Sequence, residues 1–321
     1  MMIAIDAGHG YTKGLSTRGT RTVFPSLIAP APAAVNLGSY GSGVITRIDG
    51  QDFVVGEAAR KWATPLWSHD KAIDDDTLRL ILTAAAELGA SGAVRLATGL
   101  PLSWFGAQHA TFQQALRGFG GHVTRPDGST TRLWFESVLV LPQGVAAAGP
   151  VLDHGVTEPG PYLVVDVGYR TTDYIIVTKE SDGRLTFDPT AAGSLNMGVH
   201  AVHAAVSDQL SQTYQTTFTA AQVAETATVV VRGQRIAVSP LRSQQESRVA
   251  RMIVQGLLER LDTQMDQVLG MVAVGGGSRI LSDTLPAVVT PEDPQWANAQ
   301  GYLAALEDTM PIRTGTMHGV I

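Results

Sequence analysis

The chain contains no cysteine, so its 321 residues can form no disulfide, thiolate metal site or cysteine nucleophile. It also contains no run of five or more like charges, which argues against a polybasic or polyacidic tail. No uninterrupted apolar stretch approaches the roughly 20 residues that span a bilayer. A carboxylate at Asp6 comes too early for a signal peptide. These absences predict a soluble, cytoplasmic protein with no membrane association.

Basic residues are slightly outnumbered by acidic ones. The chain has 23 Lys and Arg against 29 Asp and Glu, a formal net charge of −6. Mild acidity argues against direct, sequence-specific nucleic-acid binding, which normally requires a basic patch. Hydrophobic residues make up 44% of the chain, enough for a large core. At roughly 100–200 residues per domain, the length predicts about two domains.

One pattern occurs twice, about 160 residues apart. The apolar run 1–5 leads into Asp6 and a glycine turn at Gly8, and the apolar run 161–165 leads into Asp166 and a turn at Gly168. Each copy has an apolar strand, an Asp at its end, a Gly two residues later and then small or hydroxylated residues. This spacing is too long for a solenoid repeat. It predicts two related α/β lobes that face each other.

A third apolar run, 271–274, is followed by Gly275, Gly276 and Gly277. Backbone N–H groups in such turns bind phosphate oxygens. One turn would be weak support because most glycine pairs lie in ordinary loops, but three turns indicate a phosphate site. The Walker-type sequence is absent, and Lys13 stands where a dinucleotide fingerprint needs glycine.

Asp6 and Asp166 are the natural pair of Mg²⁺ ligands, because Mg²⁺ prefers one or two carboxylates together with substrate phosphates. The alternative is that each Asp caps its own turn. Lys13 can place a point charge against a phosphate, or it can be an exposed lysine without a role. Gln143 follows an apolar strand and can orient an attacking water, although alone it is also consistent with a loop residue.

His200 and His203 lie three residues apart on a predicted helix. Their neighbours are Ala and Val, and no third ligand is evident, so the sequence favours packed or surface histidines over a metal site. Further along, the three- and four-residue spacing of apolar residues predicts one long helix over 245–269. Segment 150–161, with two Gly and three Pro, is predicted to be a bridge between the lobes.

Five segments, in chain order, resemble the loops of the actin, sugar-kinase and chaperone ATPase superfamily. They are the first phosphate loop (6–13), the first connection (141–147), the second phosphate loop (166–173), the adenosine loop (272–278) and the second connection (297–302). Within this superfamily, segments 24–26, 54–59 and 98–101 resemble the ParM/StbA-like plasmid-segregation actins. His9, Tyr11, Tyr169 and Arg170 depart from the small residues common in those loops.

The resemblance implies an α/β, actin-like (ribonuclease H-like, duplicated) two-lobed ATPase fold with a nucleotide cleft between the lobes. Each lobe is expected to have a five-stranded core sheet. The first lobe would cover residues 1–152 with a small subdomain inserted at about 20–70, and the second would cover 153–294. Residues 295–321 would form a C-terminal helix and tail that return to the first lobe.

The resemblance also assigns roles to residues. Gln143, Asp6 and Asp166 would be catalytic, and Asp6 and Asp166 would hold Mg²⁺. ATP or ADP would be bound by Gly8, His9, Gly10, Tyr11, Thr12, Lys13, Gly168, Tyr169, Arg170, Thr171, Gly198, Gly275, Gly276, Gly277 and Arg279. Gly193 and Asn196 would lie on the nucleoside side, and the choice between ATP and GTP stays open.

The implied function is ATP binding and hydrolysis coupled to nucleotide-dependent filaments that segregate plasmid DNA. The expected partners are further copies of the chain and an adaptor protein linked to the plasmid. One alternative is a non-polymerising small-molecule kinase of the same superfamily, with Asp173 as its base. Another is a cell-division or cytoskeletal actin homologue, although tail 311–321 is too short and polar for a membrane-binding helix.

Overall fold

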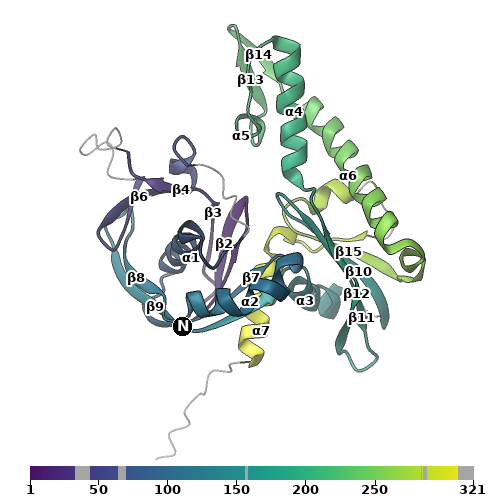
Figure 1. Ribbon diagram of the computed structural model, residues 1–321, viewed down its shortest axis with the longest axis horizontal. Coiled ribbons are helices and arrows are strands. Elements are labelled where there is room, and N and C mark those ends of the chain that lie inside the picture. The colour runs from purple at the N-terminus through teal and green to yellow at the C-terminus, as the bar shows by residue number, and fades with distance from the viewer. Residues whose placement is uncertain (33–43, 64–69, 156–157, 283, 285–287, 310–321) are drawn as a thin grey trace, which may run out of the picture.

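Two β-sheets, one in each half of the chain, form the framework of the molecule (Figure 1). The computed structural model describes residues 1–32, 44–63, 70–155, 158–282, 284 and 288–309. The predicted tail 311–321 lies outside the described residues, as do parts of the predicted subdomain at about 20–70. The sheets and their helices form two lobes, as the actin-like resemblance implies.

The sheet of the first lobe has the strand order β3-β2-β1-β7-β9-β8-β5-β6-β4 among the described residues. The strands are β1 (Met2–Ala7), β2 (Tyr11–Ser16), β3 (Arg21–Pro25), β4 (Ile28–Pro30), β5 (Ile45–Ile48), β6 (Gln51–Val55), β7 (Gly92–Leu100), β8 (Gly120–Thr124) and β9 (Thr130–Pro142). The core sheet was expected to have five strands, but here it continues for four more. The long strand β9 causes this, because it pairs with β7 on one side and with β8 on the other. The inserted strands therefore join the main sheet, which curves around a central helix (Figure 1).

Strand β1 shows how both faces of this sheet are covered. Its alternating side chains point to opposite faces, as in any strand. Ile3 and Ile5 pack in the core formed with α1 (Asp75–Glu87) and α2 (Leu102–Leu116), whereas Met2 and Ala4 pack against Tyr302 of α7 (Ala297–Thr309). Because both faces are buried, β1 is a continuous apolar run rather than an alternating one.

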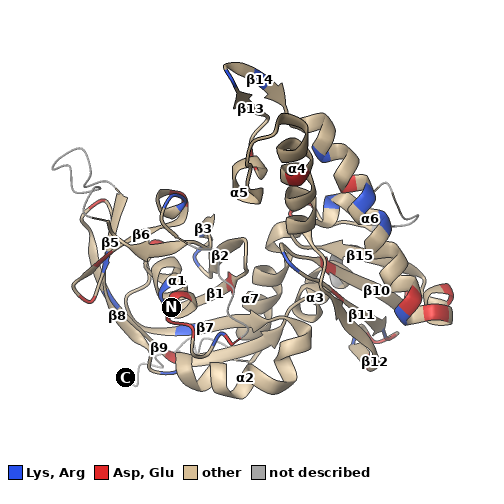
Figure 2. Ribbon diagram, turned by 45° about the horizontal axis from the view of Figure 1, so that its top comes forward, with Lys and Arg blue, Asp and Glu red and all other residues tan. Residues whose placement is uncertain are grey.

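Within the described residues, the second sheet has the order β12-β11-β10-β15-β16, in agreement with the five-stranded core sheet expected for this lobe. They are β10 (Gly160–Val167), β11 (Thr172–Lys179), β12 (Leu185–Leu195), β15 (Gly270–Val274) and β16 (Val288–Val289). One face packs on α4 (Val199–Tyr214) and α6 (Ser239–Leu261), and the other packs on α3 (Val145–Gly155). Lys and Arg are scattered over both lobes rather than gathered in one stripe (Figure 2).

Beyond the second sheet, a small cap covers the far ends of α4 and α6 (Figure 1). It consists of the short helix α5 (Ala220–Val223) and a hairpin of β13 (Thr228–Val231) and β14 (Gln234–Ala237). A separate apolar cluster that includes Val206, Val223 and Val238 holds it in place. The sequence analysis did not predict this cap.

Two predicted element boundaries were wrong. Helix α6 ends at Leu261, not at 269, because Asp262 adopts a left-handed φ of 44° and a short 3₁₀ segment follows. Met265 and Val268 continue the apolar spacing but pack on the core after this turn. The expected bridge 150–161 is helical up to Gly155, because α3 buries Val151 and Leu152.

Helices α3 and α7 cross where the two lobes meet. A side chain at Gly301 would place its Cβ 1.9 Å from the Ala146 carbonyl oxygen, so the helices touch backbone to backbone there. This close approach lets α7 return to the first lobe, where Tyr302 is fully buried. Within the described part of the chain, no helix combines the length and apolarity needed to cross a bilayer.

Candidate functional site

The two glycine turns predicted from the repeat have the same geometry. In the β1–β2 hairpin the Gly8 amide donates to the Tyr11 carbonyl at 3.2 Å, and in the β10–β11 hairpin the Gly168 amide donates to the Thr171 carbonyl at 2.8 Å. The strand registers correspond as well. Asp6 lies opposite Lys13, and the equivalent Asp166 lies opposite Asp173. The duplication seen in the sequence is therefore a duplication of backbone structure.

Asp6 is buried at the end of β1 in a charge-neutralising arrangement. Its Oδ2 accepts a 2.6 Å bond from Lys13 Nζ, and its Oδ1 accepts a 3.1 Å bond from Gln143 Nε2. Lys13 Nζ also donates to the Gln295 carbonyl at 3.2 Å. Lys13 is only 8% exposed, so the alternative of a surface lysine without a role is wrong.

Asp166 is also buried, but among the described residues no cation forms an ion pair with it. Its Oδ2 accepts a 2.6 Å bond from Asn298 Nδ2, while Asn298 Oδ1 accepts one from the Gly144 amide at 2.9 Å. Burial, with a smaller effect of the nearby Asp173 and Asp6 carboxylates, raises the pKa of Asp166 to about 7, although the Asn298 hydrogen bond and Lys13 oppose this rise. Asn298 therefore connects the second phosphate turn to the first connection between the lobes.

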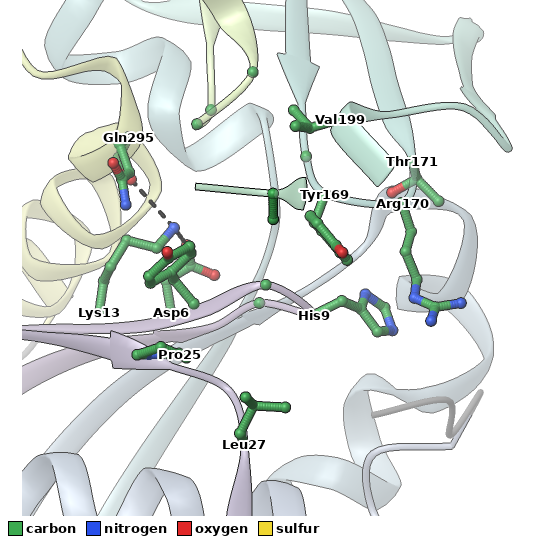
Figure 3. Close-up of a pocket in the computed structure, with 18 of the residues that line it drawn as sticks. Asp6, His9, Lys13, Pro25, Leu27, Tyr169, Arg170, Thr171, Val199 and Gln295 are labelled. Atoms are coloured by element: carbon green, nitrogen blue, oxygen red, sulfur yellow. Dashed lines mark hydrogen bonds and ion pairs between the residues drawn. The ribbon is translucent and has the colours of Figure 1, made fainter. Parts of the chain in front are cut away.

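The alternative in which each Asp caps its own turn does not hold. Among the described residues, the carboxylates of Asp6 and Asp166 accept their side-chain hydrogen bonds from Lys13, Gln143 and Asn298, and none from a backbone amide of their own turns. Both acids instead line a pocket of about 280 Å³ between the lobes, and Figure 3 shows Asp6 at its wall.

Most of the predicted site residues line this one pocket. Those that do are Asp6, Gly8, His9, Gly10, Tyr11, Lys13, Gln143, Asp166, Gly168, Tyr169, Arg170, Thr171, Gly275, Gly276 and Gly277. Figure 3 shows Asp6, Lys13 and His9 reaching it from the first lobe and Tyr169, Arg170 and Val199 from the second. The structure thus gathers three glycine turns and two acids around one cavity.

Three predicted nucleotide contacts lie elsewhere. Thr12 is fully buried, and its hydroxyl shares a 2.9 Å hydrogen bond with that of Ser26. Gly198 precedes α4 and packs behind the second turn, where an added Cβ would lie 2.5 Å from the Gly168 carbonyl oxygen. Arg279 is exposed on a short 3₁₀ segment (Ser278–Leu281).

The two residues assigned to the nucleoside side are also outside the pocket lining. Gly193 lies on β12, where an added Cβ would be 2.4 Å from the Tyr174 hydroxyl, and Asn196 is exposed. Gly193 lies near the end of β12 and Asn196 follows that strand directly, and neither residue lines the cavity.

The sequence analysis missed several lining residues. Lys71 is buried, and its Nζ donates to the Ala7 carbonyl at 2.7 Å; burial lowers its pKa to about 8. Arg60 bridges the lobes through a 3.2 Å ion pair with Glu225. No periodicity or spacing in the sequence marks these residues, because they reach the pocket from separate elements.

The two histidines have different surroundings. His203 is 9% exposed and lines the pocket, whereas His200 places its Nδ1 3.3 Å from the Tyr169 hydroxyl. The described residues include no cluster of three or more His, Cys, Asp or Glu suited to a metal ion. The packed reading of the sequence therefore fits His203, with the addition that one edge of it faces the cavity.

Asp173, the base of the kinase alternative, is occupied by structural contacts. Its Oδ2 accepts a 3.2 Å bond from the Leu102 amide, and its Oδ1 accepts the Ser194 hydroxyl. It is 4% exposed and does not line the pocket. These contacts connect the start of α2 in the first lobe to β11 and β12 in the second.

The residues present fit a magnesium ion bound together with a phosphate ligand. Two carboxylates face one cavity, and Mg²⁺ usually takes one or two carboxylates, several waters and phosphate oxygens. Burial of Asp166 without a cation costs free energy that a divalent ion would offset. Because both oxygens of Asp6 and the Oδ2 of Asp166 already have protein partners, water-mediated coordination suits the site better than a closed protein cage.

Family models divide the chain at the same place as the two lobes. The N-terminal domain of actin-like proteins matches residues 4–145, and the C-terminal, MreB-like domain of archaeal actin homologues matches residues 164–287. An archaeal actin homologue from Thermoplasma acidophilum is 28% identical over 97% of this chain and 100% of its own length. One from Thermoplasma volcanium is 27% identical with the same coverage.

Solved structures agree with this assignment. An archaeal actin homologue in complex with ADP superposes with a TM-score of 0.80 at 26% identity, covering 96% of this chain and 99% of that one. A subunit of a 15-stranded ParM filament from Clostridium botulinum gives a TM-score of 0.82 with the same coverage; at 19% identity this shows the shared fold. On these matches and the duplicated two-lobed architecture, the chain is an actin-like protein similar to archaeal actin homologues, and it shares its fold with ParM.

Proposed function

We propose that the chain binds Mg-ATP between its lobes, hydrolyses it and assembles into filaments whose stability depends on the nucleotide. The observation that carries this proposal is the convergence of three glycine turns and two buried acids on one cavity. Free backbone amides in such turns bind phosphate oxygens, and the cavity lies where both lobes contribute to it.

In this proposal each side of the cavity has its own task. Lys13 and Lys71 supply positive charge from the first lobe, and the amides after Gly168 contact phosphate from the second. A magnesium ion held by Asp6 and Asp166 through water would neutralise charge on the phosphates.

Gln143 would position the attacking water. Its side-chain amide is anchored by Asp6, so its orientation at the pocket wall is fixed before a ligand enters. Phosphoryl transfer to water depends mainly on positioning and charge stabilisation, and a glutamine can supply the first.

Closure of the lobes would connect the nucleotide to assembly. Asn298 and Gln143 lie at the connections between the lobes and contact the two acids directly, so a ligand between these acids alters the hinge region first. Head-to-tail contacts that do not close into a ring produce filaments. The filament form of a ParM relative of the same fold supports this mode of assembly.

Calorimetric titration with Mg-ATP, phosphate release and light scattering test the three parts separately. Scattering of protein at tens of micromolar should rise with ATP and not with ADP or without nucleotide. Absence of binding would overturn the whole proposal, whereas binding without scattering would overturn only the filament.

Of the alternatives, the kinase is disfavoured because both Asp173 oxygens are engaged and the residue lies outside the cavity. Plasmid segregation through an adaptor protein remains a prediction from the ParM resemblance. Retention of adaptor-bound plasmid by sedimented filaments would test it.

A further inference from the structure

The wall of the cavity beyond the glycine turns is formed by one face of α4 and by α5. Val199 and His203 lie four residues apart and therefore on the same helix face, and both line the cavity. Val199 packs directly on the third glycine turn, since a Cβ at Gly277 would lie 2.5 Å from its Cγ2. Figure 3 shows Val199 beside Tyr169, on the second-lobe side of the cavity. The α4 face thus continues the cavity away from the two acids.

The next residues along this wall have small side chains. Ala221 and Ala224 of the α5 segment line the same cavity as His203, and the charged pair Arg60–Glu225 lies at its rim. Small apolar groups leave room for a flat ring. This part of the cavity therefore suits the nucleoside of a nucleotide whose phosphates lie at the turns.

His203 is a polar side chain on the α4 face that lines the cavity, and it is neutral. Burial, followed by the Arg242 guanidinium and His200, lowers its pKa to about 4. A neutral imidazole has one donor and one acceptor nitrogen. It is therefore suited to hydrogen bonding with an uncharged group and poorly suited to binding phosphate.

The two ring nitrogens of His203 differ in their surroundings. Nδ1 is buried and has no hydrogen-bond partner among the described residues. Nε2 also has no protein partner there but is not one of the buried unpartnered atoms, so it is open to the cavity that the ring lines. We assign the proton to Nε2, because an N–H at the buried Nδ1 would have no acceptor whereas one at Nε2 can meet solvent or ligand.

We propose that His203 is a nucleoside-recognition residue: its Nε2–H donates a hydrogen bond to an acceptor atom of the purine nucleoside whose phosphates occupy the glycine turns. This inference rests on the proposed nucleotide binding. It adds a specificity-determining contact on α4 to the phosphate contacts of the turns.

The test compares two ligands that differ only by the nucleoside. Affinities of wild type, His203→Leu and His203→Gln for Mg-ATP and for magnesium tripolyphosphate are measured by calorimetric titration. His203→Leu should weaken ATP binding about 3- to 10-fold, the range of one net hydrogen bond, and leave tripolyphosphate binding unchanged. His203→Gln, which keeps an N–H donor, should recover most of the loss.

His200→Leu is the matched control, since it removes the same ring one turn away on α4 at a position outside the cavity lining. It should leave both affinities within about twofold. Equal loss of both ligands in His203→Leu, or unchanged ATP binding, would overturn the inference while leaving the nucleotide site intact. Wild type that binds neither ligand would instead overturn the proposed function, and this inference with it.

Discussion

The two strand-end acids occupy equivalent positions in the two lobes, yet their electrostatic environments are opposite. In the first hairpin the residue across from Asp6 is Lys13, and the two form a 2.6 Å ion pair. In the second hairpin the residue across from Asp166 is another acid, Asp173. Asp166 therefore relies on the neutral amide of Asn298.

This contrast shows that the duplication preserves the backbone geometry of the two hairpins but not the charges of their side chains. The turn hydrogen bonds of Gly8 and Gly168 and the strand register are the same in both copies. The charge of the residue opposite each acid differs between the copies: the first hairpin pairs an acid with a lysine and is neutral, whereas the second pairs two acids. The second lobe therefore has the greater need for a cation from outside the chain, which agrees with the raised pKa of Asp166.

The strongest test of this contrast is the same substitution at both acids, measured without nucleotide. Asp6→Asn leaves Lys13 as a buried, unpaired cation and should lower the free energy of unfolding by about 3–5 kcal/mol. Asp166→Asn removes a buried acid with a pKa of about 7 that forms no ion pair among the described residues, and it should leave the free energy of unfolding within about 1 kcal/mol of wild type or slightly raise it. Denaturant unfolding at pH 7 gives both values.

Asp6→Asn combined with Lys13→Met provides the control, since removing both partners should restore part of the lost stability. Equal destabilisation by Asp6→Asn and Asp166→Asn would mean that the two acids are electrostatically equivalent, contrary to the contrast drawn from the structure.

Gln143 contacts only the first of the two acids, so its removal should affect hydrolysis and spare the phosphate-binding turns. We expect Gln143→Ala to slow phosphate release about 100-fold, equivalent to about 2.7 kcal/mol, because the water loses its positioning group. Mg-ATP affinity should change less than threefold. Single-turnover phosphate release together with calorimetric titration checks both, and unchanged release would remove Gln143 from the mechanism.

The sequence predicted the hairpins well because their signal is local. An apolar run, an Asp and a Gly two residues later specify a buried strand and its turn within about ten residues, and the same signal in both halves indicated the two lobes. Hydrogen-bond partners that lie far apart in the sequence were harder to predict. Asn298 was placed in a connection by resemblance, but nothing in its neighbourhood shows that it holds Asp166 and the Gly144 amide together.

Other features depended on tertiary packing and were missed or misplaced. Helix α6 ends before Asp262, which has a positive φ. The apolar spacing continues past this point because Met265, which follows the turn, still packs against the core of the second lobe. The first sheet grew beyond five strands because β9 is long enough to pair on both sides. The sequence favoured packed or surface histidines without deciding between them, and only the structure shows that His203 is buried and lines the cavity.

A smaller effect concerns the pH dependence of stability in the second lobe. The pKa of His203 is about 4 in the folded chain, below the usual 6.5, so the unfolded chain takes up a proton first as pH falls. This residue should therefore cost about 2 kcal/mol of stability between pH 7 and pH 5. His203→Gln should lose correspondingly less stability than wild type over that interval in denaturant titrations. A difference between the two proteins that stays constant with pH would contradict the buried, neutral imidazole.

The smallest expected effect lies at the rim of the cavity, where Arg60 of the first lobe meets Glu225 of the second at 3.2 Å. This contact differs from the buried Asn298 connection at the base because Glu225 is 55% exposed and Arg60 also pairs with Glu57. Solvent screening and the competing partner should hold the coupling between Arg60 and Glu225 below about 1 kcal/mol. A double-mutant cycle of Arg60→Met and Glu225→Gln measures it, and the coupling should decline further when salt is raised. A salt-independent coupling above about 2 kcal/mol would instead make the rim, rather than the base, the main electrostatic connection between the lobes.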